Sequence, residues 1–107
     1  MYQHASPDPV YLYLARVYKV VTSWPKAERV KYAREMLKLA NKPVPTTFEP
    51  FAMVILCTSS AARVDNKHRN RWARALQYAD QNNINSKALE EFIVEHGGLA
   101  KCGNSLF

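Results

Sequence analysis

Proline and turn residues divide this 107-residue chain into five stretches, each about as long as one helix. Asp8 is a favourable N-cap, and Pro9 suits the first turn of a helix, where a missing N–H costs nothing. Pro25 disfavours helical backbone in the residue before it, so one helix ends there and the next begins. Pro43 stops that second helix. We therefore expect helices over about 9–23, 25–41, 47–61, 66–80 and 86–96.

The central apolar run, Phe51 to Cys57, has a pattern that does not decide between helix and buried strand. Thr46 and Glu49 have the spacing of a capping box, which marks the N-terminus of a helix. The chain contains no second strand-like segment that could pair with the run. We therefore expect a helix here too, and a single all-α domain over 1–107 that folds as a compact bundle of about five helices.

Composition places the chain among small globular domains, with 48% hydrophobic and 22% charged residues. The longest apolar run has seven residues, which is too short to span a membrane, and the N-terminus lacks the pattern of a signal peptide. Two cysteines, Cys57 and Cys102, do not make a disulfide framework. We expect a cytoplasmic protein with free thiols and no membrane partner.

Charge is distributed unevenly along the chain, although the formal net charge is +6. Residues 16–42 contain eight basic and two acidic residues, and residues 63–74 contain five basic and one acidic. Residues 80–95 reverse the balance, with one basic and four acidic residues. The protein is therefore bipolar, and its positive charge belongs to the second and fourth expected helices.

On a helical wheel the fourth expected helix separates into two faces. Lys67, Arg71 and Arg74 share one face with Tyr78, whereas Trp72 lies on the opposite, apolar side. A row of cations suits the regularly spaced phosphates of nucleic acid. The same row also fits a solvated face that keeps the domain soluble.

The second expected helix carries a similar basic stripe, set apart from its apolar face. Two stripes with few interspersed acids make a nucleic-acid partner as well supported as a merely solvated surface. The residues expected to contact phosphates are Arg63, Lys67, Arg69, Arg71, Arg74, Lys31, Arg34 and Lys38.

The segment that joins the last two expected helices has a recognisable spacing. Ala79 is small where a second helix must approach closely, and Asn83 occupies a turn position that needs left-handed backbone. This spacing resembles the helix-turn-helix of DNA-binding proteins over 66–96. The residues placed for base contacts are Asn85, Ser86 and Lys87.

The outward face of the last helix departs from this resemblance because it carries carboxylates. Glu90, Glu91 and Glu95 follow the candidate base contacts and should be repelled by phosphates. Either only the first turn of that helix reaches DNA, or the basic fourth helix is the contacting element. The third interpretation is a plain helical corner with no role in binding.

No local pattern typical of a catalytic or metal site is present in the sequence. The three histidines and two cysteines lack the spacings of metal ligands. The three glycines lie near the C-terminus and form no phosphate-binding loop. We therefore expect neither an enzyme nor a cofactor or metal.

These observations favour a small regulator or accessory protein that binds nucleic acid, most simply double-stranded DNA. The alternative is a protein-interaction module, or a small inhibitor of a nucleic-acid enzyme such as the anti-defence proteins of mobile elements. In that interpretation the bipolar surface docks on a charged protein, for example an acidic one. A homodimer is natural for a DNA regulator, although no dedicated dimerisation segment is visible.

Overall fold

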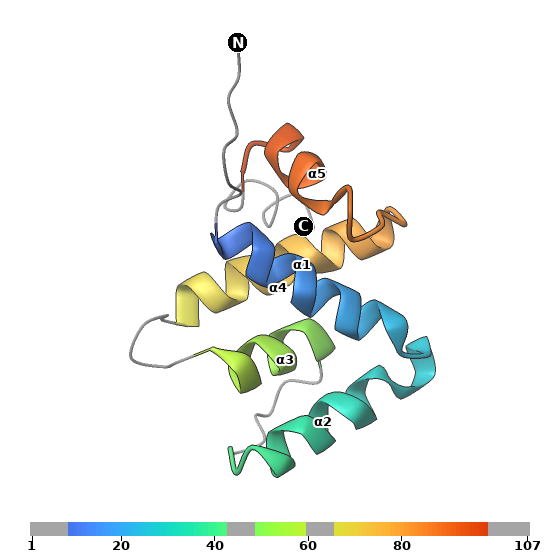
Figure 1. The fold of residues 1–107 in the computed structure, drawn as a ribbon, viewed down its shortest axis with the longest axis vertical. Coiled ribbons are helices and arrows are strands. Elements are labelled where there is room, and N and C mark those ends of the chain that lie inside the picture. The colour runs from blue at the N-terminus through green and yellow to red at the C-terminus, as the bar shows by residue number, and fades with distance from the viewer. Residues whose placement is uncertain (1–8, 43–48, 60–65, 99–107) are drawn as a thin grey trace.

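The computed structural model describes residues 9–42, 49–59 and 66–98 (Figure 1). All regular structure in these residues is helical, which confirms the expected all-α fold. The elements are α1 (Pro9–Ser23), the 3₁₀ turn η1 (Lys26–Glu28), α2 (Arg29–Leu39), α3 (Pro50–Thr58), α4 (Asn66–Gln81) and α5 (Leu89–Glu95).

The helix boundaries follow the expected ones closely at α1 and α4 and differ elsewhere. Residue Pro25 has extended backbone, with ψ at 138°, so the second expected helix is a 3₁₀ turn followed by α2. Helix α3 is shorter than expected because Glu49 itself is the N-cap, with its carboxylate accepting the Ala52 N–H at 2.8 Å. The capping role expected for Thr46 lies outside the described residues.

Helix α3 lies between α2 on one side and α1 and α4 on the other (Figure 1). Its side chains Phe51, Met53, Val54 and Ile55 are all buried. A helix that is apolar on every side belongs in the interior of a bundle. This position explains why the apolar run showed no helical period in the sequence.

The remaining core is supplied by the faces of α1, α2, α4 and α5 that point towards α3 and towards each other. Small residues on α4, including Ala75 and Ala79, are fully buried and allow the neighbouring helices to approach closely. The buried hydrophobic residues outside α3 are Leu14, Val17, Tyr18, Val21, Ala33, Leu37, Ala73, Ala75, Leu76, Ala79, Leu89, Phe92 and Ile93.

Three helices end in the same way, on a residue with left-handed backbone. These residues are Asn41 after α2 and Asn83 after α4, both with φ at 56°, and Gly97 after α5, with φ at 89°. In each case the backbone N–H of the next residue donates a hydrogen bond to a carbonyl in the last turn of the helix. The bonds are Lys42 to Leu37, Ile84 to Ala79 and Gly98 to Ile93, at 3.0–3.1 Å. This is the Schellman motif, and it confirms the left-handed backbone expected at Asn83.

Among the described residues, no helix is both long enough and apolar enough to cross a membrane.

Candidate nucleic-acid interface

The basic face of α4 is exposed, as the helical wheel predicts. The side chains of Lys67, Arg71 and Arg74 all lie on the surface, and we call these three residues the α4 row. Residues spaced by three or four positions share a helix face, so the row runs along about 10 Å of the helix. The opposite face of α4 is buried.

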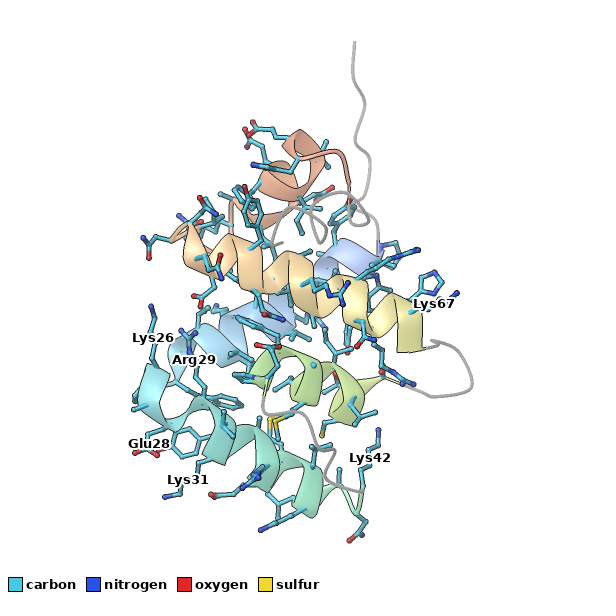
Figure 2. The ribbon with its side chains drawn as sticks, turned by 180° about the vertical axis from the view of Figure 1, so that it is seen from behind. Lys26, Glu28, Arg29, Lys31, Lys42 and Lys67 are labelled. Carbon is cyan, nitrogen blue, oxygen red and sulfur yellow. The ribbon has the colours of Figure 1, made fainter. Side chains whose placement is uncertain are left out.

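Two members of the α4 row present their charge to solvent. Within the part of the chain that the structure describes, neither Lys67 nor Arg71 forms an ion pair. The ammonium of Lys67 extends from the N-terminal end of α4 (Figure 2). Between Asn66 and Ala79 the helix carries no acidic residue, so nothing on α4 itself neutralises the row before Asp80.

Arg69 does not belong to this surface, contrary to the expectation that it contacts phosphate. Its exposed fraction is 8%, and its Nε donates a hydrogen bond to Ser59 Oγ at 3.1 Å. Position 69 lies about 200° around the helix from position 67, so the helical wheel already separates it from the α4 row. Arg69 instead ties α4 to the residue that follows α3.

Tyr78 shares the face of the α4 row but is covered by the last helix. Its ring centroid lies 5.5 Å from that of Phe92 and 5.3 Å from that of His96. The ring is therefore packed against protein and is not presented for stacking on a base. The exposed basic surface ends at Arg74.

The basic stripe of α2 does not join the α4 row. Lys31 and Lys38 are exposed and Arg34 is half-buried, but α3 lies between α2 and α4 (Figure 2). Lys31 and Lys67 lie on helices at opposite sides of α3 in this view. The two stripes are therefore separate surfaces, and Arg63 lies outside the described residues.

The three candidates for base contact lie in the turn before α5, and not in its first helical turn. Helix α5 begins at Leu89, whereas the sequence pattern predicts a start near residue 86. The side-chain oxygen of Asn85 accepts the Ala88 N–H at 2.9 Å, which occupies one of its hydrogen-bonding groups. Ser86 is half-buried and Lys87 is exposed.

Acidic side chains lie beyond the C-terminal end of the α4 row. Glu91 and Glu95 are exposed on α5, and Glu90 is half-buried. Because α5 packs against α4 at Tyr78, these carboxylates belong to a helix that neighbours the C-terminal half of α4.

A partly buried polar cluster where the start of α2 meets the end of α4 was not predicted from the sequence. The guanidinium of Arg29 pairs with Asp80, and the hydroxyl of Tyr18 donates to the Ile84 carbonyl. Burial, helped by the Asp80 charge, raises the pKa of Tyr18 to about 12. Burial also raises the pKa of Glu49 to about 7. No sequence motif marks these residues, because they meet only when the helices pack.

Within the described residues, no group of three or more histidine, cysteine or acidic side chains is arranged to hold a metal ion.

Comparisons with protein-family models, curated proteins and solved structures return no match. The α4 row is therefore interpreted from its own geometry and charge.

Proposed function

We propose that this protein binds nucleic acid, specifically double-stranded DNA, through the α4 row. The observation that carries the proposal is the exposure of Lys67, Arg71 and Arg74 along one face of a helix that contains no acidic residue between Asn66 and Ala79. Such a row matches the charge pattern of a phosphate backbone. The proposed role is that of a regulator or accessory factor, and not of an enzyme.

Helix α4 suits this role better than α5. An α-helix fits the major groove of B-DNA, where arginine can recognise guanine and asparagine can recognise adenine. The exposed arc of α4 carries both side-chain types, since Asn70 lies between the basic residues. By contrast, α5 has only seven residues and carries Glu90 and Glu91 in its first turn.

Salt-dependent binding is the direct test of this proposal. Fluorescence anisotropy with a random-sequence duplex, between about 50 and 300 mM salt, should give a log K against log salt slope of about −3. That slope corresponds to three neutralised phosphates, one for each member of the α4 row. A slope near zero would contradict an electrostatic interface.

The variant that tests the site is Arg71→Glu combined with Arg74→Glu, which should abolish binding and leave the helical circular dichroism unchanged. The matched control is Lys19→Glu with Lys26→Glu, which changes the net charge equally at exposed residues outside α4. The control should bind at least tenfold more tightly than the α4 variant. Equal affinities would show that net charge, and not the α4 row, attracts the DNA.

The alternative function is a protein-interaction module or a small inhibitor of a nucleic-acid enzyme. The observation that favours it is the presence of oppositely charged exposed residues on two helices in contact, the α4 row on one and Glu91 and Glu95 on α5. A pull-down after nuclease treatment separates the two functions. A stoichiometric protein partner that survives nuclease supports the alternative, whereas loss of all captured material supports nucleic-acid binding.

A further inference from the structure

A shallow apolar groove with a volume of about 250 Å³ lies on the face formed by α1, α2 and α3. Its lining includes Tyr13, Arg16 and Val20 of α1, Met36 of α2, and Val54 and Thr58 of α3. None of the lining residues belongs to α4. The groove is therefore a surface distinct from the α4 row.

The groove exists because α1 and α2 diverge from the corner that joins them, with α3 between them (Figure 1). At the corner, Trp24 and Tyr32 pack edge to face with ring centroids 5.6 Å apart. Farther along α1, the hydroxyl groups of Tyr13 and Thr58 are joined by a hydrogen bond. Val54, which is almost fully buried, forms part of the floor.

Apolar side chains in the lining of the groove and nearby on α2 are exposed to water. Val20 is 40% exposed, and Leu39, which lies one turn beyond Met36 on α2, is 86% exposed. Exposed apolar residues beside an apolar hollow are typical of surfaces that bind another protein. The groove can thus accept further apolar side chains.

The charge around the groove is positive on the α1 side. Arg16 is the one charged residue among the lining residues, and Lys19 is exposed one turn away on the same helix, which has no acidic residue. Within the described part of the chain, Arg16 forms no ion pair. Glu35 is exposed on α2. It lies about 100° around that helix from Met36, so it does not share the face of α2 that lines the groove.

We infer that this groove binds an amphipathic, acidic helix of a partner protein. Apolar side chains spaced by three, four and seven positions would enter the groove, as in other helix-in-groove complexes. Carboxylates beside them would pair with Arg16 and Lys19. Helix α5 of a second copy is a poorer occupant, because its one large exposed hydrophobic side chain is Val94.

Two synthetic peptides test the inference by ¹⁵N–¹H NMR titration of the whole protein. Both are amphipathic helices with the same leucine pattern, and one carries glutamate where the other carries lysine. The glutamate peptide should shift the amide signals of Val20 and Met36 and bind at least tenfold more tightly than the lysine peptide. Val20→Asp should weaken that binding at least tenfold, and Arg16→Ala should reduce the preference for glutamate.

Two variants serve as controls for folding and for the proposed function. Val94→Asp alters a more exposed valine on α5 and should leave peptide affinity unchanged. Arg71→Glu alters the α4 row and should weaken DNA binding without affecting the peptide, so that failure of one proposal is distinguishable from failure of the other. Circular dichroism of Val20→Asp checks that the partly exposed site tolerates the substitution.

Three results would overturn the inference. The first is the absence of shifts at the groove, and the second is equal affinity for the two peptides, which would remove the role of charge. The third is a change in the groove signals with protein concentration alone, which would identify a second copy as the occupant.

Discussion

The guanidinium of Arg29 binds the carboxylate of Asp80 across 51 positions of sequence, with Nη1 2.8 Å from Oδ2. The pair joins the first residue of α2 to the last turn of α4, and the two side chains are only 10% and 23% exposed. The Nε of Arg29 is also buried and makes no hydrogen bond within the described residues. Arg29 therefore depends on Asp80 for compensation of its charge.

Asp80→Asn should destabilise the protein by about 2 to 4 kcal/mol, because it leaves a largely buried guanidinium without its counter-charge. Urea unfolding followed by circular dichroism measures the loss. Adding Arg29→Met to this variant should recover part of the stability, since the unpaired charge is then gone. A loss no larger than that of the exposed control Glu35→Gln would contradict a role for this pair in stability.

Glu49→Gln should change stability in a pH-dependent way. Burial raises the pKa of Glu49 in the folded protein from 4.5 to about 7, so the folded state holds this proton more tightly than the unfolded state. This bound proton adds at most about 3 kcal/mol to the free energy of unfolding. The contribution is fully present below about pH 4.5 and is lost as the pH rises from there through about 7. Glutamine can still accept the Ala52 N–H but does not titrate. The variant should therefore be more stable than the native protein at pH 8 and similar to it at pH 4.5, and a difference independent of pH would contradict this prediction.

Lys42→Met should lower stability by about 1 to 2 kcal/mol, because the ammonium stabilises the C-terminal end of α3. Its Nζ donates to the carbonyls of Leu56, Cys57 and Ser59 at 3.1, 2.7 and 3.3 Å. Thermal unfolding compares this variant with Lys38→Met, which removes an equal charge from an exposed position on α2. Equal melting temperatures for the two variants would show that the cap contributes nothing.

Two substitutions at Asn83 distinguish the contribution of backbone conformation to stability from that of the side chain. Its φ of 56° suits glycine, so Asn83→Gly should change stability by less than about 0.5 kcal/mol, whereas Asn83→Ala should destabilise by about 1 kcal/mol. The control Asn70→Ala, in the exposed middle of α4, should be neutral or stabilising because alanine favours helix. Chemical unfolding measures all three variants, and equal effects of glycine and alanine at position 83 would contradict the proposed role of the left-handed turn.

Local features of this protein were predictable from the sequence because they depend on residues a few positions apart. Pro9 starts α1, Asn83 adopts left-handed backbone, and the α4 row lies on one exposed face of its helix. Each follows from backbone sterics or from the periodicity of a single helix. The all-α fold followed likewise from proline positions and from the spacing of apolar residues.

Tertiary packing determines which residues on the polar faces of the helices are exposed and which of them form one continuous surface. Tyr78 is covered because α5 folds over it, and the stripes of α2 and α4 are separate because α3 lies between them. The Arg29 and Asp80 pair and the groove beside Arg16 likewise require helices that are distant in the sequence. A helical wheel describes one helix alone, so burial by another helix, and the contacts that follow from it, enter only when the helices pack together.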